Sequence, residues 1–204
     1  MDLNLKNKVI IVTGGSSGIG KGIVQVLAKE GAVPFVIGRN VKNINSIVNF
    51  VKQNGGHAGF AIAELTDPEQ CIKAVEKVIT NFGRIDGLVN NAGVNDGVGL
   101  ENGSYEEFML SIKRNVAHYY LMANLALAYL KKSKGAIVNI GSKTSVTGQR
   151  GTCGYAAANG GRNALTREWA VELLPHALFR CGSRPNILRW CSNYGMDLHF
   201  PIRR

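Results

Sequence analysis

The sequence has no long hydrophobic run: none of its apolar stretches approaches the roughly 18 residues that a membrane-spanning helix needs. Its first residues, MDLNLKNK, are too polar for a signal peptide. These two absences argue against a membrane partner and lead us to expect a cytoplasmic protein. With 204 residues, 45% of them hydrophobic, the chain is long enough for one complete core, so one domain is the default expectation.

Metal-binding and nucleic-acid-binding patterns are also missing. The four cysteines form no CxxC pair and the four histidines are scattered, which favours reduced thiols and no metal site. The net charge is +10, but no cluster of arginines alternates with aromatic residues, which make up only 7% of the chain. We therefore expect no nucleic-acid partner despite the basic balance.

What the sequence does contain is a glycine-rich loop between a strand and a helix. Residues 8–12, KVIIV, are typical of a buried strand, and TGGSSGIG at 13–20 leads into a helical pattern that ends near Gly31. Such a loop presents backbone N–H groups and a helix N-terminus to a phosphate. An ordinary turn is the alternative. The candidate residues for a dinucleotide pyrophosphate are Thr13, Gly14, Ser16, Ser17, Gly18, Ile19 and Gly20.

Further strands alternate with helices along the chain. Asp67 with Pro68 is a start signal for one helix, and Ser104 with Glu107 is a start signal for another. The alternation predicts an α/β fold with a doubly wound parallel sheet in three layers, where ligands bind beyond the carboxyl ends of the strands. The later strands are predicted at 33–37, 59–63, 85–89 and 136–140, and helices at 68–81, 104–130 and 151–172.

The residues that follow these strands are candidates for one shared crevice, in which Gly14, Asn91 and Ser142 are expected to meet. Arg39 follows the second strand, where an acid suits a ribose 2′-hydroxyl and an arginine suits a 2′-phosphate, so it favours NADP over NAD. A solvent-exposed surface arginine is the alternative. Glu64 and Leu65 follow the third strand, and Leu65 is expected near the adenine. The loop after the fourth strand is expected to line the cofactor side with Asn91, Ala92 and Gly93.

The predicted helix at 151–172 places Tyr155 and Asn159 four residues apart, on one face. A tyrosine in a polar cleft can act as a proton donor or acceptor. Its anion then needs stabilising, because the reference pKa of a phenol is near 10. The sequence should therefore supply a cation for the tyrosinate, and Asn159 does not. A buried tyrosine that only caps a core helix is the alternative to a catalytic one.

These motifs together resemble the classical short-chain dehydrogenase/reductase family. They are TGGSSGIG, NNAG at 90–93, Asn115 in a helix, Ser142, and Tyr155 thirteen residues after that serine. The resemblance covers roughly residues 5–175. Three segments, VNNAGVNDGVGLE, NIGSKTSVTGQ and NALTREWAVELL, are similar to bacterial members that act on sugars, L-fucose dehydrogenases among them.

The resemblance implies a role for each of these residues. Tyr155 would exchange a proton with the substrate's hydroxyl or carbonyl while a hydride passes to or from the nicotinamide. Ser142 would hold the same oxygen, and Asn115 would keep a helix backbone open to an ordered water. The implied cofactor is NADP, or alternatively NAD, and the implied substrate is a small alcohol or carbonyl compound. Family members usually pair through the helices that here span 104–130 and 152–174, which predicts a homodimer or homotetramer.

One departure from the family pattern lies at the predicted catalytic helix. The family signature is Tyr-x-x-x-Lys, and its lysine stabilises the tyrosinate and holds the nicotinamide ribose. Asn159 can still hydrogen-bond a ribose hydroxyl, but it brings no positive charge. Arg162, seven residues beyond Tyr155, is offset by about 10 Å along the helix axis and is expected to be a poor substitute. Lys143 is a second candidate cation, so our hypothesis is weak activity or help from a neighbouring cation.

The second departure is the end of the chain. After residue 175 the segment 176–204 shows no periodic apolar pattern, so we expect an atypical basic tail in place of the family's last strands and substrate loop. A single oxidoreductase unit would then span 1–175. Three functions remain open: an oxidoreductase that uses NADP on a polar alcohol or carbonyl such as a sugar, an impaired dinucleotide-binding module, or an interaction protein with an open sheet edge.

Overall fold

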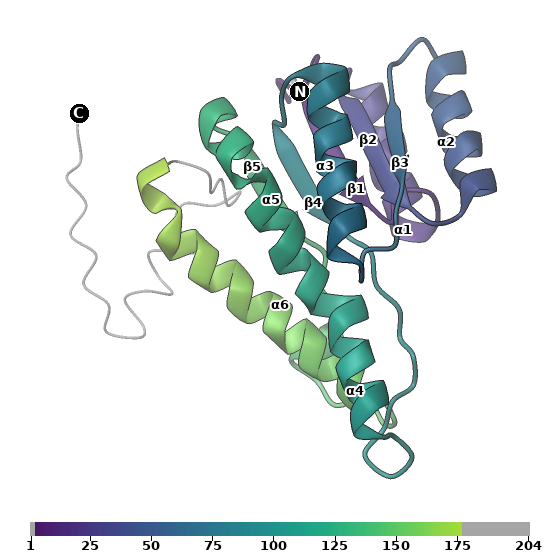
Figure 1. The fold of residues 1–204 in the computed structure, drawn as a ribbon, viewed down its shortest axis with the longest axis vertical. Helices are drawn as coiled ribbons and strands as arrows, with labels where there is room; N and C mark the ends of the chain where they lie inside the picture. Colours follow the sequence, from purple (N-terminus) through teal and green to yellow (C-terminus); the bar gives the residue numbers. More distant parts are fainter. Residues whose placement is uncertain (1–2, 177–204) are drawn as a thin grey trace.

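The computed structural model of the protein describes residues 3–176 and contains a sheet of five parallel strands in the order β3-β2-β1-β4-β5 (Figure 1). All the predicted strands are confirmed, with ends that differ by one or two residues. The five strands are β1 Val9–Thr13, β2 Val33–Gly38, β3 Gly59–Ile62, β4 Gly87–Asn90 and β5 Ala136–Asn139.

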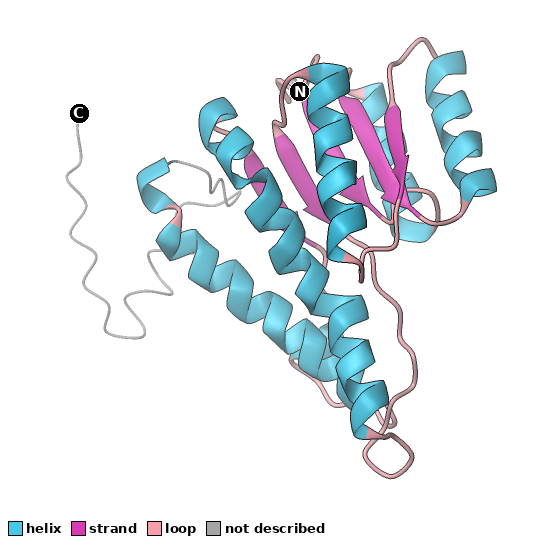
Figure 2. Ribbon diagram, in the orientation of Figure 1, coloured by secondary structure: helices cyan, strands magenta, loops and turns pink. Residues whose placement is uncertain are grey.

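Helices cover both faces of this sheet (Figure 2). One core joins the sheet to α1 and α2, and a second core joins the other face to α3, α5 and α6. The helices are α1 Gly18–Lys29, α2 Val41–Gln53, α3 Pro68–Phe82, α5 His118–Ser133 and α6 Cys153–Glu172. Sequence analysis made no prediction for α2. Three layers with this strand order form the Rossmann arrangement, which confirms the predicted fold class.

Local signals in the sequence account for several of these boundaries. The side chain of Asp67 accepts hydrogen bonds from the first amides of α3, and Pro68 occupies the first turn. A capping box joins Ser104 and Glu107 at the start of α4, Tyr105–Ile112. These caps satisfy amides that have no partner inside a helix, so they fix where each helix begins.

The prediction of one helix over 104–130 is wrong. A π-helical turn at Lys113–Ala117 separates α4 from α5. A π turn accommodates one extra residue, so it interrupts the regular ladder of backbone hydrogen bonds. Asn115 is fully buried inside this turn. Together, α4 and the first part of α6 project past the end of the sheet toward which the strand arrows point (Figure 2).

Residues 177–204, and with them the predicted tail, lie outside the described residues. Within residues 3–176, no helix combines the length and hydrophobicity that a bilayer crossing requires. The same residues contain no His, Cys, Asp and Glu group arranged to hold a metal ion. Both cysteines in this part of the chain, Cys71 and Cys153, are free thiols.

Candidate active site

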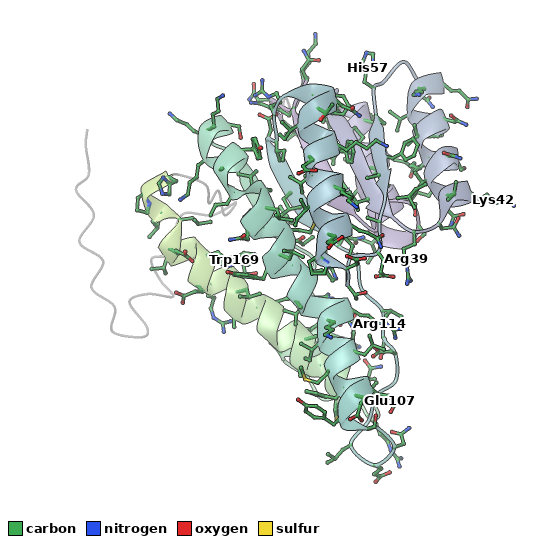
Figure 3. The ribbon with its side chains drawn as sticks, viewed as in Figure 1. Arg39, Lys42, His57, Glu107, Arg114 and Trp169 are labelled. Atoms are coloured by element: carbon green, nitrogen blue, oxygen red, sulfur yellow. The ribbon has the colours of Figure 1, made fainter. Side chains whose placement is uncertain are left out.

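A cleft of about 670 Å³ lies at the carboxyl ends of the strands, the location predicted for the shared crevice. Arg39 and Arg114, both labelled in Figure 3, lie at this end of the molecule and line the cleft. The structure brings thirteen of the predicted site residues to its walls: Gly14, Ser16, Ser17, Gly18, Ile19, Gly20, Arg39, Glu64, Leu65, Asn91, Ala92, Gly93 and Tyr155.

The glycine loop leaves the sheet through a turn that requires glycine. Gly14 has a φ of +64°, and a Cβ atom on Gly20 would overlap the carbonyl oxygen of Gly14. The same Cβ would approach Nδ2 of Asn91 to 2.5 Å. The loop therefore packs directly against the loop that follows β4. The free amides at the start of α1 line the cleft with the loop, a geometry that suits a phosphate group.

Thr13 holds these two loops together and does not line the cleft. Its hydroxyl accepts hydrogen bonds from the amides of Asn91 at 2.9 Å and Ala92 at 3.1 Å. In return, Nδ2 of Asn91 donates to the Thr13 carbonyl at 2.9 Å. The glycine loop is thus positioned by side-chain contacts to a segment 78 residues away in the sequence.

An ion pair joins Arg39 and Glu64 at one end of the cleft. Nη1 of Arg39 lies 2.8 Å from Oε2 of Glu64, and the arginine side chain is 73% exposed. Burial raises the pKa of Glu64, but hydrogen bonds from Thr66 and Arg39 outweigh it and hold that pKa below its ordinary value. Glu64 is therefore ionised at neutral pH. The adjacent Leu65 is buried and lines the wall.

At the opposite end, α6 brings Tyr155 and Arg162 to the cleft. Tyr155 is half-buried, whereas Arg162 is only 3% exposed, and both line the cavity. The expectation that Arg162 lies too far along the helix is wrong. A helical side chain points back toward the N-terminus, and the long arginine side chain covers the axial offset.

The amide of Asn159 is not brought into the cleft. Asn159 is fully buried, its Nδ2 donates to the Tyr155 carbonyl at 2.9 Å, and its Oδ1 accepts from Nη1 of Arg162 at 3.0 Å. Lys143, the second candidate cation, is exposed and is not among the residues that line the cleft. Of the two alternative cations, Arg162 is therefore the one that lines the cleft with Tyr155.

Neither Asn115 nor Ser142 lines the cleft, although Ser142 was predicted to share it with Gly14 and Asn91. Oδ1 of Asn115 accepts from the Val94 amide at 2.8 Å, which ties the π-helical turn to the loop after β4. The hydroxyl of Ser142 accepts from the Thr144 amide at 3.3 Å and begins a short 3₁₀ turn, Lys143–Ser145. Its neighbour Gly141 lines the cleft.

His118 is a cleft residue that sequence reasoning missed. It lies at the start of α5, is 2% exposed, and has Nε2 3.0 Å from the Arg114 carbonyl oxygen. Burial lowers its pKa to about 4, so the imidazole is neutral at pH 7. The sequence feature that could have identified it is spacing, because His118 is three residues after Asn115 and, in a helix, would share its face.

Comparison with known proteins finds relatives of this chain. A family model described as short chain dehydrogenase matches residues 8–181. A 3-oxoacyl-(acyl-carrier-protein) reductase FabG from Thermotoga maritima is 33% identical over 172 residues, which cover 84% of this chain and 70% of that protein. A sorbitol-6-phosphate 2-dehydrogenase from Klebsiella pneumoniae is 34% identical over 197 residues, which cover 91% of this chain and 71% of that protein.

A solved structure shows the same fold. The crystal structure of Cj0485 dehydrogenase superposes with a TM-score of 0.81 and 39% identity, over 87% of this chain and 68% of that one. The two relatives named above differ widely in their substrates, and they do not single out a sugar dehydrogenase.

Proposed function

The chain belongs to the short-chain dehydrogenase family of oxidoreductases, and we propose that it transfers a hydride between NADP and an alcohol or carbonyl substrate. One observation carries this proposal. A glycine loop suited to a pyrophosphate and a tyrosine phenol, 135 residues apart in the sequence, open into a single cleft. A dinucleotide spans such a crevice in a doubly wound sheet, with its reactive ring away from the phosphate loop.

The residues present fit a dinucleotide. The absence of a side chain at Gly20 lets α1 pack directly against Gly14 and Asn91, so the start of the helix and the glycine loop line the cleft together and suit a pyrophosphate. The cofactor supplies the hydride chemistry when it is bound. Tyr155 exchanges a proton with the substrate oxygen, and the family resemblance gives Ser142, next to the cleft residue Gly141, a hydrogen bond to that oxygen. Proton transfer by a positioned side chain contributes roughly 10²–10⁴-fold to such reactions.

Arg39 supports NADP as the cofactor. Its guanidinium is exposed at the cleft wall after β2, where the ribose of the adenosine lies in this fold, and a guanidinium suits a 2′-phosphate. The ion pair with Glu64 holds the side chain beside the cavity. NAD is the alternative, because Glu64 itself could accept a hydrogen bond from a 2′-hydroxyl.

A polar substrate such as a sugar is the finer part of the proposal. The loop after β4 carries the exposed Asn95 and the carboxylate of Asp96, which accepts from the Ser111 hydroxyl at 2.8 Å. Hydrogen-bonding groups of this kind suit a substrate with several hydroxyls, L-fucose among them. Self-association through the helices of the α4–α6 side into a dimer or tetramer stays a prediction from the family resemblance.

A second candidate is a dinucleotide-binding protein with little turnover. Asn159 favours it, because that position lacks the charge that the family signature supplies. The two candidate functions involve the same cofactor and differ only in whether the protein turns over a substrate.

The test compares the protein with a Tyr155→Phe variant. We expect NADP to raise the melting temperature of both proteins, because a ligand that binds only the native state stabilises it. Turnover of a panel of alcohols, sugars and ketones should fall at least about 100-fold in the variant. Binding without turnover in the unmodified protein would favour the second candidate. A melting temperature that ignores both NADP and NAD would refute both candidates.

A further inference from the structure

We propose that Arg162 supplies the positive charge that stabilises the ionised form of Tyr155, and that Asn159 and the π-helical turn hold its guanidinium in place. The proposal rests on the proposed function, since it names the cation for that proton transfer. It assigns Asn159 a positioning role, through Arg162, in place of direct contact with the cofactor.

The position of the guanidinium is fixed by hydrogen bonds. Nε donates to the Asn115 carbonyl at 2.5 Å and Nη1 donates to the Ile140 carbonyl at 3.0 Å. Nη1 also donates to Oδ1 of Asn159 at 3.0 Å, and Nη2 donates to Oδ1 of Asn115 at 3.3 Å. A guanidinium has five N–H donors, so these four bonds leave one on Nη2. That donor remains for Tyr155, which lines the same cleft and lies about two helical turns before Arg162 on α6.

The charge on this guanidinium has no carboxylate partner within residues 3–176. All four acceptors are neutral carbonyl or amide oxygens, and the ion pairs of the described chain involve other residues. The ring of Tyr119 lies under it, 4.3 Å from Cζ to the ring centroid. A buried positive charge without an anion interacts strongly with any negative charge that forms beside it, because water screens it poorly. A tyrosinate at position 155 is such a charge.

The ionisation of Arg162 responds to the same surroundings. Burial lowers the pKa of Arg162 by more than the nearby Tyr119 and Tyr155 raise it, so the net effect is a decrease. Arginine begins so far above neutral pH that it stays protonated. The side chain thus brings a permanent charge to the wall of the cleft.

The π-helical turn explains how the arginine fits. The carbonyl of Asn115 accepts from Nε of Arg162, so the arginine occupies the position where the family resemblance implied an ordered water. Gly93 makes space on the other side, since a Cβ there would lie 2.6 Å from Nη2 of Arg162 and 2.8 Å from Oδ1 of Asn115. The guanidinium therefore lies between the π turn, the loop after β4 and the phenol.

The hydrogen bonds of Arg162 predict how a lysine at position 159 would affect turnover. An Asn159→Lys substitution alone would place a second cation against Nη1 of Arg162, which now bonds to Oδ1 of Asn159. We expect it to give no gain in turnover. In an Arg162→Leu background the same lysine supplies a replacement charge one helical turn from Tyr155, and it should restore the function that Arg162→Leu removes.

The experiment measures the ionisation of Tyr155 in the cofactor-free protein. Tyrosinate absorbance is titrated with pH in each protein, and the curve of its Tyr155→Phe counterpart is subtracted. We expect Arg162→Leu to move the midpoint to higher pH by about 1–3 units, because a nearby opposite charge favours the ionised form by that much. Asn159→Lys/Arg162→Leu should return the midpoint toward its original value. Arg167→Leu, at an exposed arginine on the same helix, is the control and should leave it unchanged.

Turnover gives a second readout. Arg162→Leu should lower kcat by about 10²–10³-fold, as loss of a preorganised charge does elsewhere, and the double variant should recover most of it. If Arg162→Leu does not fold, Arg162→Lys and the double variant carry the test, and both should keep the original midpoint within about one unit. An unchanged midpoint in Arg162→Leu would overturn the proposal, as would a gain in turnover from Asn159→Lys alone. A shifted midpoint in a protein without turnover would leave the cation assigned and refute the oxidoreductase function.

Discussion

The two ends of the cleft use an arginine in different ways. Arg39 is exposed and paired with a carboxylate, so water screens its charge and the side chain can move to meet a ligand. Arg162 is buried, held by four hydrogen bonds, and paired with no carboxylate in the described chain. The first arrangement suits recognition of a cofactor that comes and goes. The second suits a charge that must already be in place when a proton moves.

The two ends of the cleft also differ in whether the backbone or the side chains shape them. The phosphate end is built from a turn whose shape depends on glycine. The tyrosine end is built from buried polar side chains of α6 and the π turn, which also bond to the backbone carbonyl of Ile140 just after β5. Changes at the first end should therefore weaken cofactor binding, and changes at the second should affect proton transfer and stability. Three substitutions test this division.

Gly20→Ala should have the largest effect. The added methyl would overlap the Gly14 carbonyl oxygen, so the loop must shift away from Asn91. We expect a loss of about 1–3 kcal/mol in the free energy of unfolding, as overpacking of a tight site causes, and loss of the cofactor-dependent rise in melting temperature. Thermal melts with and without NADP measure both.

Gly22→Ala is the matched control, because its added methyl meets no atom within 4 Å and the residue lies on the exposed side of α1. Alanine is favoured over glycine inside a helix by about 1 kcal/mol, so this variant should be slightly more stable and bind cofactor normally. Normal cofactor binding by Gly20→Ala would show that the glycine loop is not the phosphate site.

The glycine loop could be predicted because its conformation is encoded locally. A buried strand, a run of glycines and a helical pattern follow one another within residues 8–31, and each signal acts over a few residues. The same holds for the caps at Asp67 and Ser104, which fixed helix starts correctly. The carboxyl-end rule then placed Gly14 and Asn91 at one cleft without any knowledge of side-chain contacts, but it failed for Ser142, which does not line the cleft.

The tyrosine end could not be predicted in the same way. The π turn at 113–117 follows no local breaker, and its Asn115 carbonyl accepts from a side chain 47 residues away. Helical spacing placed Arg162 too far from Tyr155 because it counts the rise of the backbone and leaves out the reach of a long side chain. Its contacts to Ile140 and Asn115 depend on how α6, β5 and the π turn pack, which is tertiary information.

The buried side chain of His118 provides a test of how polar residues in the cleft wall affect the stability of the fold. Its pKa is about 4 in the folded protein against about 6.5 when unfolded. Between these values the unfolded state binds more protons, so the free energy of unfolding rises with pH over that window and falls as pH drops from 6.5 to 4. The loss attributable to His118 should reach about 3 kcal/mol at its lower end.

Urea unfolding of the protein and of His118→Gln at several pH values between 4 and 7 measures this effect. The variant should lose less stability on acidification, since glutamine does not titrate. His57→Gln, at an exposed histidine, controls for loss of a histidine as such (Figure 3). Parallel stability curves for the protein and His118→Gln would contradict a buried, neutral His118.

Arg39→Ala should have the smallest effect and the most selective one. A charged hydrogen bond to a phosphate stabilises a complex by about 1.5–3 kcal/mol, and exposure reduces that value, so NADP affinity should fall about tenfold. NAD affinity should change little, because NAD has no 2′-phosphate. Lys42→Ala, an exposed position on α2, is the control (Figure 3).

Glu64→Gln gives a second measurement at the same end of the cleft. It releases Arg39 from its ion pair and removes a negative charge near the phosphate, so NADP should bind more tightly. If Arg39→Ala weakened NAD and NADP equally, Arg39 would be reading the shared part of the two cofactors, and the preference for NADP would lose its structural basis.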